Sequence, residues 1–271
     1  MRKKYFFFDI DGTLTDEATH QLVPGALYAL HKLEESGHFV SIATGRAHYK
    51  AKPLTDRIGI QNIVCAGGAC LVREGTVIEN IPLPREKIIP FLEQADSREC
   101  GWLLMLNDSD EVYMRDYRFL QQAGLRREQT TYLYEPKLDY HAVPSIFKVY
   151  LAMNQKQEAQ EEWRQAFSFL RLTPAYCVYQ YDAKKTGIIR MLENVRGNIA
   201  DVVVFGDGKN DLVMFDSAWT SIAMGNGAPA LKERADFVTA KNTDNGILRA
   251  CRHFGWIDPE KDDRFQNILP L

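Results

Sequence analysis

The feature that most constrains the fold is a short apolar stretch near the start of the chain that ends in two carboxylates. Residues 4–8 (Lys-Tyr-Phe-Phe-Phe) are strand-forming and almost wholly apolar, and Asp9 and Asp11 follow at once. Such a run predicts a central strand that is buried on both faces, as in a parallel sheet. Gly12 indicates that the chain turns there, which leaves both carboxylates at the strand's carboxyl end, where open α/β sheets bind ligands. An ordinary Asp-Gly turn is the alternative.

Strand and helix signals alternate over both ends of the chain. The expected strands lie at 39–43, 62–66, 201–205, 219–224 and 236–239, and the expected helices at 24–36, 187–195 and 228–234. Residues 71–80, with Glu74-Gly75 in their middle, are typical of a β-hairpin. This alternation predicts an α/β fold with a doubly wound, Rossmann-like parallel sheet.

The pattern changes at Pro82-Leu83-Pro84, which indicates a linker. Up to about residue 182 the signals are α+β, with helices expected at 85–95 and 155–170 and strands at 102–106, 111–115, 146–153 and 177–181. We therefore predict an α/β core domain formed by residues 1–82 and 184–271, with an α+β domain inserted at 83–183. Lys148, in one of the inserted strands, is interpreted as an ordinary strand residue rather than as a substrate contact.

Composition and charge narrow the classes of function. Lys and Arg number 33 against 36 Asp and Glu, and the net charge of −3 argues against a nucleic-acid binder. No apolar run is long enough to span a bilayer, and the chain enters its first strand without a signal peptide, so no membrane partner and a cytoplasmic location are expected. The odd, scattered set of cysteines indicates reduced thiols rather than disulfides or a zinc site: Cys65, Cys70, Cys100, Cys177 and Cys251.

Polar groups follow three of the expected strands, and they suggest phosphoryl chemistry. They are Asp9 and Asp11, then Thr44-Gly45, then Asp207 with Asn210 and Asp211. Carboxylates from two strand ends make a hard-oxygen site that suits Mg²⁺. The sequence has no glycine-rich nucleotide loop, so hydroxyl, backbone N–H and a lysine from the Lys184-Lys185 pair would hold the phosphate. One carboxylate can then act as the nucleophile and the other as the acid and base.

These residues resemble the motifs of the haloacid dehalogenase (HAD) superfamily. The four matching segments are DIDGTL at 9–14, ATGR at 43–46, a lysine before Thr186-Gly187, and GDGKND at 206–211. The insert resembles the C2 cap of the Cof-type, subclass IIB phosphatases, and the resemblance covers essentially the whole chain. It implies a substrate-specificity role for the cap.

The resemblance also implies a role for each matching residue. Asp9 would be the nucleophile and Asp11 the acid and base, while Thr44, Gly45 and Asn210 would bind the phosphoryl group. The charge-offsetting lysine would be Lys184, with Lys185 as the alternative. The metal ligands would be Asp9, the main-chain carbonyl of Asp11, and Asp207, with Asp211 supporting the metal shell. One departure is Gly67, which stands where relatives usually carry an asparagine and so removes a side chain that could contact substrate.

The expected function is a Mg²⁺-dependent phosphatase that hydrolyses small phosphorylated metabolites through an aspartyl-phosphate. A phosphomutase, which returns the phosphoryl group to a sugar, and a sensor that binds a phosphorylated metabolite without turnover are the alternatives. The sequence predicts neither the individual substrate nor the oligomeric state.

Overall fold

The chain divides into two units in the computed structural model, which describes residues 2–158, 169–171 and 173–257. Unit 1 comprises Met1–Arg46, Ala51–Glu79 and Ala183–Leu271, and unit 2 comprises Ala47–Lys50 and Asn80–Asp182. These boundaries lie close to those expected at 82/83 and 183/184. Unit 2 begins at Asn80, slightly before the expected residue 83. Pro82 already contacts unit 2, since the Tyr181 hydroxyl donates a hydrogen bond to the Pro82 carbonyl at 3.1 Å.

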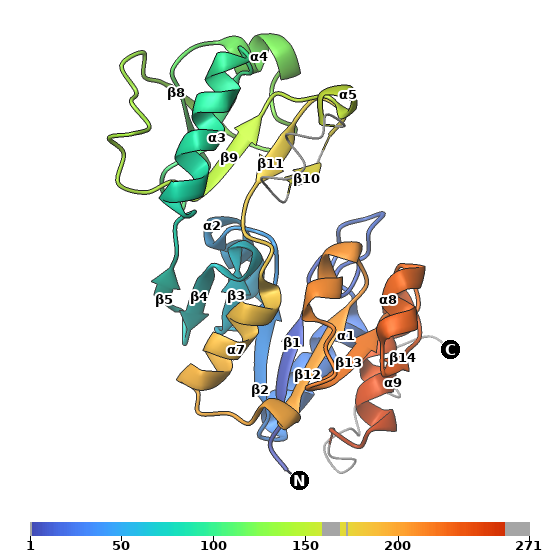
Figure 1. Cartoon of the computed structure of the whole chain (residues 1–271). Helices are drawn as coiled ribbons and strands as arrows, with labels where there is room; N and C mark the ends of the chain where they lie inside the picture. Colours follow the sequence, from blue (N-terminus) through green and yellow to red (C-terminus); the bar gives the residue numbers. More distant parts are fainter. Residues whose placement is uncertain (1, 159–168, 172, 258–271) are drawn as a thin grey trace. The chain divides into compact units, whose positions relative to one another are not determined.

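Unit 1 is built on a mainly parallel sheet in which β1 is central (Figure 1). The strand order is β14-β13-β12-β1-β2-β3-β4-β5. β1 pairs in parallel with β12 and β2, whereas β3 and β4 are antiparallel. The strands are β1 (Tyr5–Phe8), β2 (Phe39–Ala43), β3 (Ile63–Cys65), β4 (Cys70–Arg73), β5 (Thr76–Asn80), β12 (Val202–Gly206), β13 (Thr220–Ala223) and β14 (Phe237–Val238). The predicted α/β class is confirmed.

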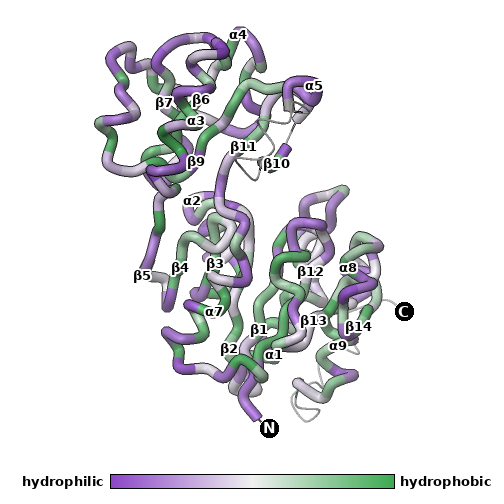
Figure 2. Tube along the Cα trace, viewed as in Figure 1, coloured by the Kyte–Doolittle hydropathy of each residue, from purple (hydrophilic) through white to green (hydrophobic). Residues whose placement is uncertain are grey.

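The alternation of side chains along β1 explains the layers of unit 1. Phe6 and Phe8 pack with α1 and α9 on one face of the sheet, and Phe7 packs with α7 and α8 on the other. All three rings are fully buried, and β1 and β12 are coloured mainly as hydrophobic in Figure 2. The helices are α1 (Pro24–Glu35), α2 (His48–Ile58), α7 (Lys184–Asn194), α8 (Pro229–Arg234) and α9 (Gly246–His253), with 3-10 turns η1 (Ala66–Gly68), η2 (Ile199–Asp201), η3 (Lys209–Met214) and η4 (Asn242–Asp244).

Unit 2 contains a second, mixed sheet with the strand order β10-β11-β9-β6-β7-β8. Its hydrophobic clusters lie on opposite faces, one packed with α3 and the other with α4. The elements are α3 (Arg85–Ser97), β6 (Trp102–Met105), β7 (Glu111–Met114), α4 (Arg118–Ala123), β8 (Thr131–Tyr134), β9 (Lys148–Leu151), α5 (Gln155–Glu158), β10 (Phe169–Arg171) and β11 (Cys177–Tyr179).

Several elements differ from the sequence-based expectation. The helix predicted at 155–170 begins as α5, but its expected end is wrong because Leu170 lies in β10; residues 159–168 are outside the described part. α4, β8 and α9 were not predicted, because each is short and packing rather than a long periodic pattern defines it. α7 begins at Lys184, three residues before the predicted start at Gly187.

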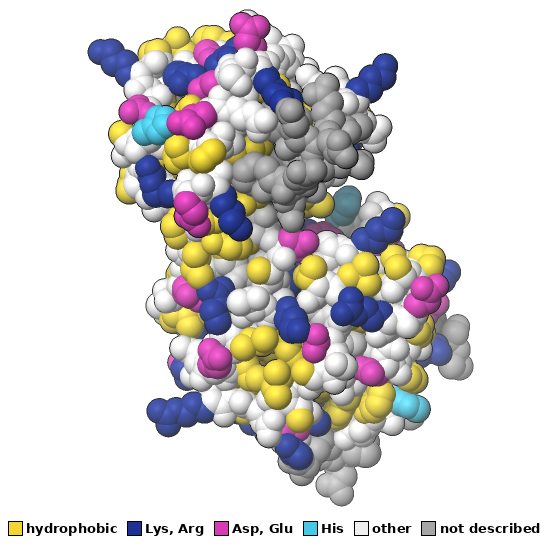
Figure 3. Space-filling view, viewed as in Figure 1, with side chains coloured by type: hydrophobic (Ala, Val, Ile, Leu, Met, Phe, Trp, Pro, Cys, Tyr) yellow, Lys and Arg dark blue, Asp and Glu magenta, His cyan; other side chains and the backbone are white. Residues whose placement is uncertain are grey.

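No helix in the described residues has both the length and the apolar character that crossing a membrane requires. On the face drawn in Figure 3, side chains of both charge signs are interspersed, in keeping with the small net charge.

Two glycines after β3 let α7 begin close to that strand. The Ala183 N–H donates to the Gly67 carbonyl at 2.7 Å. Gly68 has a φ of +97°, and a Cβ added to it would lie 2.2 Å from the Ala183 carbonyl oxygen. Only glycine allows this approach without displacing backbone, and Lys184 is the next residue along the chain.

Gly68→Ala is expected to lower the free energy of unfolding by about 2–5 kcal/mol, because left-handed strain and a backbone clash add together. Gly75→Ala is the matched control: Gly75 has a φ of +76°, but its added Cβ would meet nothing within 4 Å. It should cost only the strain, about 1–2 kcal/mol. Urea unfolding of both variants measures the difference, and equal costs would contradict the close-approach argument.

Candidate active site

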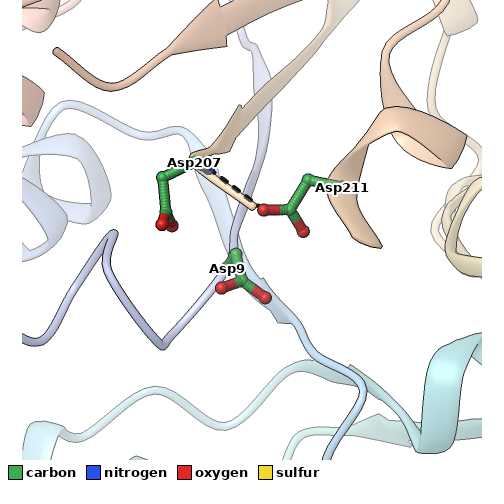
Figure 4. A group of neighbouring side chains, drawn as sticks. All are labelled: Asp9, Asp207 and Asp211. Carbon is green, nitrogen blue, oxygen red and sulfur yellow. Dashed lines mark hydrogen bonds between the residues drawn. The ribbon is translucent and has the colours of Figure 1, made fainter. Parts of the chain in front are cut away.

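Three buried carboxylates meet at the carboxyl edge of the unit 1 sheet. Asp9 directly follows β1, Asp207 directly follows the neighbouring β12, and Asp211 lies in η3. Each offers one carboxylate oxygen, and these oxygens lie within 4.8 Å of one another. Figure 4 shows the three side chains gathered around one region. The parallel pairing of β1 and β12 brings the ends of both strands to the same place, which is why residues almost two hundred positions apart come together.

Hydrogen bonds from neighbouring groups fix the orientation of the Asp211 and Asp207 carboxylates. The N–H groups of Asp207 and Gly208 donate to Asp211 Oδ2 at 3.0 and 2.9 Å, which leaves its Oδ1 for the cluster. The Thr13 hydroxyl donates to Asp207 Oδ1 at 2.7 Å. Gly12 has a φ of +83°, and a Cβ there would lie 2.1 Å from Asp207 Oδ2, so a side chain at this position would occupy the carboxylate's place.

A buried lysine completes the cluster. Lys184 Nζ donates to Asp9 Oδ1 and to Asp211 Oδ1, at 2.6 Å in each case. The neighbouring Lys185 points elsewhere and pairs with Asp216 at 2.5 Å, because successive residues of a helix are about 100° apart around its axis. Of the two lysines that the sequence left open, the structure therefore brings Lys184 to the carboxylates.

Burial and mutual repulsion shift the pKa values of these groups. Burial raises the pKa of Asp9 to about 8, with the Asp211 charge adding to the rise and Lys184 opposing it. Burial raises the pKa of Asp207 to about 7, although the Thr13 hydrogen bond opposes this shift. Burial alone would lower the pKa of Lys184, but the charges of Asp9 and Asp211 outweigh it and raise that pKa. The lysine is therefore an ammonium, and the carboxylates bind a proton or another cation more readily than isolated acids do.

The donor set fits a magnesium ion. Three carboxylates against one ammonium leave the fully ionised cluster with two negative charges. Mg²⁺ prefers a few carboxylate oxygens and retains waters in its remaining positions. Asp9, Asp207 and Asp211 are thus the residues that could hold it.

Thr44 and Gly45 lie at the end of the other strand beside β1. Thr44 is buried, and its N–H donates to the Val64 carbonyl at 2.8 Å, which holds the loop against β3. Thr44 Oγ1 accepts a hydrogen bond from the Arg46 N–H at 3.1 Å, so the hydroxyl proton is left to donate elsewhere. A hydroxyl donor and the adjacent backbone can bind a phosphoryl oxygen.

The structure keeps the Asp11 side chain out of the carboxylate cluster. This side chain is about half exposed, and both of its oxygens pair with the Arg46 guanidinium, with Arg46 Nε donating to Oδ2 at 3.0 Å. The sequence analysis assigned no role to Arg46 and did not anticipate this pair. The predicted metal contact through the Asp11 carbonyl stays a prediction.

Asn210 precedes Asp211 in the chain, but it does not belong to the buried carboxylate cluster. It is exposed in η3, so its predicted phosphate contact also stays a prediction. Sequence reasoning assigned no role to Thr13 or Asn226. Asn226 Nδ2 donates to the Gly12 carbonyl at 2.8 Å and so supports the turn beneath Asp207. Thr13 lies inside the DIDGTL segment at 9–14, which is the signal that could have identified it, whereas Asn226 lies in none of the four quoted segments.

Comparison with known proteins places the chain in a family. The model of the haloacid dehalogenase-like hydrolases matches residues 6–251. The Bacillus subtilis (strain 168) protein YkrA is 32% identical over 257 residues, covering 94% of this chain and 99% of YkrA. The Escherichia coli (strain K12) pyridoxal phosphate phosphatase YbhA is 25% identical over 92% of this chain and 97% of its own length.

A solved structure supports the same assignment at the level of fold. The subclass IIB sugar phosphatase BT4131 has a TM-score of 0.73 and 24% identity to this chain, covering 94% of this chain and all of its own. The chain belongs to the haloacid dehalogenase-like hydrolases and is a phosphatase of that superfamily.

Proposed function

We propose that the chain hydrolyses small phosphorylated metabolites with Mg²⁺ through a phosphoryl group carried on Asp9. The observation that carries this proposal is the cluster of Asp9, Asp207 and Asp211 around Lys184. The family membership and a relative named as a pyridoxal phosphate phosphatase support the substrate class.

The reaction takes place in two displacements. A carboxylate oxygen of Asp9 attacks phosphorus, the ester P–O bond breaks, and Asp11 donates a proton to the leaving oxygen. Water then attacks the phosphorus of the aspartyl-phosphate and gives a proton to Asp11. The bond between phosphorus and Asp9 breaks, which releases inorganic phosphate and restores both aspartates.

The surrounding groups stabilise the charge that the transferring phosphoryl group carries. Lys184 and the Thr44 hydroxyl offset negative charge on the nucleophile and on the phosphoryl oxygens, with Gly45 supplying a backbone N–H. A magnesium ion held by Asp9, Asp207 and Asp211 would supply further electrostatic stabilisation and orient the phosphate.

The pair between Asp11 and Arg46 adds a requirement to this mechanism. Both carboxylate oxygens of Asp11 accept hydrogen bonds from the Arg46 guanidinium, so neither oxygen faces a leaving group while this pair is formed. Asp11 must therefore leave Arg46 before it can protonate the leaving oxygen. The half-exposed position of the pair gives the side chain room to rotate.

Phosphate release from p-nitrophenyl phosphate and from pyridoxal phosphate, measured with and without Mg²⁺, tests the proposed function. Wild-type protein should release phosphate only with the metal, and Asp9→Asn should lower kcat by roughly 10³-fold or more, since the nucleophile is lost. Asp56→Asn is the matched control, because Asp56 is exposed and its carboxylate pairs with Lys52 within α2. Normal turnover by Asp9→Asn would rule out Asp9 as the nucleophile.

Metal binding should stabilise the fold more strongly at higher pH. The pKa values of Asp9 and Asp207, about 8 and about 7, lie above their ordinary value of 3.8, so the metal-free fold loses stability as pH rises between about 4 and 8. Mg²⁺ competes with the protons. Saturating Mg²⁺ at about 100 times Kd should add about 2.7 kcal/mol at pH 8.

Thermal unfolding with and without Mg²⁺ at pH 6 and pH 8 measures this effect. The Tm increase should be larger at pH 8, and Asp207→Asn should reduce it at both values. An equal increase at the two pH values would contradict a cluster that exchanges protons for the metal.

A further inference from the structure

The turn that follows β1 in unit 1 is held from outside by two asparagine side chains. Within the turn, the Gly12 N–H donates to the Thr15 carbonyl at 3.1 Å. Asn226, which follows β13, donates from Nδ2 to the Gly12 carbonyl at 2.8 Å. Asn242, in η4, donates from Nδ2 to the Thr15 carbonyl at 2.8 Å. Two carbonyl groups of the turn are therefore bound by amides from distant parts of the chain.

The two asparagines are also bonded to each other. The Asn242 N–H donates to Asn226 Oδ1 at 3.0 Å. Because a backbone N–H can only donate and a carbonyl can only accept, the Asn226 amide has one orientation, with its oxygen toward Asn242 and its nitrogen toward Gly12. The hydrogen bonds form a closed ring through Gly12, Asn226, Asn242 and Thr15. Loss of one member of such a network weakens the others.

The loop that carries Asn226 also holds the backbone of Asp207. The Ala228 N–H donates to the Asp207 carbonyl at 2.8 Å. A Cβ added to Gly227 would lie 3.2 Å from Asp207 Cα, so the loop and Asp207 are in close contact. Asn226 links this same loop to the turn that carries Thr13, whose hydroxyl donates to Asp207 Oδ1 at 2.7 Å. One loop therefore fixes Asp207 and the turn relative to each other.

The fit between the turn and the Asp207 carboxylate is close at Gly12. A Cβ added to Gly12 would lie 2.1 Å from Asp207 Oδ2. A turn that shifted would press on this carboxylate or lengthen its hydrogen bond from Thr13. Since the groups of a binding site must be held within about 0.5 Å of the productive geometry, the position of the turn matters for any ligand of Asp207.

We propose that Asn226 and Asn242 are positioning residues for the carboxylate cluster, and that they act through the turn to hold Asp207 in the geometry that binds Mg²⁺. This inference rests on the proposed function in one respect, the identity of the metal. The ring uses only backbone groups of the turn. Asp11 can therefore leave Arg46 by side-chain rotation while the backbone beside Asp207 stays fixed.

Asn62 offers a matched control, because its side chain bridges two backbone groups in the same way. Its Nδ2 donates to the Val40 carbonyl at 3.2 Å, and its Oδ1 accepts from the Glu74 N–H at 3.2 Å. Like Asn226, it is partly buried. Asn62 precedes β3, at the amino ends of the parallel strands, whereas the carboxylates meet at the opposite edge of the sheet. Asn62→Ala thus removes similar contacts without affecting the turn.

Calorimetric titration with Mg²⁺ of wild-type protein, Asn226→Ala and Asn62→Ala tests the inference. The Kd for Mg²⁺ should rise roughly 10- to 100-fold in Asn226→Ala, since groups that orient metal ligands typically contribute that much to affinity. Asn242→Ala should raise the Kd as well, and Asn62→Ala should keep the wild-type Kd. An unchanged Kd in Asn226→Ala, or an equal rise in Asn62→Ala, would overturn the inference.

A double variant tests whether Asn226 acts through the turn. The rise in Kd for Asn226→Ala combined with Thr13→Val should be smaller than the product of the two single effects, because both changes release Asp207 from the same turn. Effects that simply multiply would contradict this route.

Thermal unfolding should show that Asn226→Ala is folded, and Asn226→Asp serves in its place if it is not. The aspartate keeps an acceptor for the Asn242 N–H but turns an oxygen toward the Gly12 carbonyl. It should therefore raise the Kd for Mg²⁺ although it adds a negative charge, and a lower Kd would overturn the inference.

Phosphate release separates this inference from the proposed function. If wild-type protein binds Mg²⁺ but releases no phosphate from p-nitrophenyl phosphate or pyridoxal phosphate, the proposed function fails, and the comparison of Kd values still decides the inference. Phosphate release by wild-type protein, with equal Kd values in wild type and Asn226→Ala, would overturn the inference alone. A wild type that binds no Mg²⁺ would overturn both.

Discussion

The hydrogen bonds from Lys184 to Asp9 and Asp211 are the interaction on which the site depends. Two buried carboxylates this close repel each other strongly in a medium of low dielectric, and one ammonium at 2.6 Å from both offsets that repulsion. The arrangement leaves the cluster negative overall, so it still attracts a divalent cation. Lys184 also holds Asp9 in one orientation through a fixed hydrogen bond, which the proposed role of Asp9 as a nucleophile requires.

The rest of unit 1 can be understood as the means of bringing that lysine and those carboxylates together. The parallel pairing of β1 with β12 brings Asp9 beside Asp207, and the N–H groups at the start of η3 orient Asp211. Lys184 is the first residue of α7, and it reaches the cluster because Gly68 lets the chain before α7 approach the loop after β3. Phe6, Phe7 and Phe8 bury both faces of β1, and so hold Asp9 at the end of a rigid strand.

The carboxylate positions could be predicted from the sequence because each follows a strongly apolar strand, and strands of a parallel sheet end at one edge. The family resemblance favoured Lys184 over Lys185, but the residue pattern alone left both open, since the choice depends on where α7 begins and the helical periodicity is clear only from Gly187. The Asp11–Arg46 ion pair could not be predicted from the sequence either, because its formation depends on the rotamers that the two side chains adopt. In unit 2, the burial of Lys148 was not predicted. Alternation along a strand shows which face of the sheet a side chain lies on, but it does not show which elements cover that face.

The most direct test of the central role of Lys184 compares Lys184→Met with Lys185→Met. The measurement is kcat for p-nitrophenyl phosphate with saturating Mg²⁺, on variants whose folded state is confirmed by thermal unfolding. We predict that Lys184→Met lowers kcat by roughly 10²- to 10³-fold, since it removes the ammonium beside the proposed nucleophile, Asp9. Lys185→Met should stay near the wild-type rate, because Lys185 pairs with Asp216 outside the cluster. A folded Lys184→Met variant with normal kcat would contradict this account.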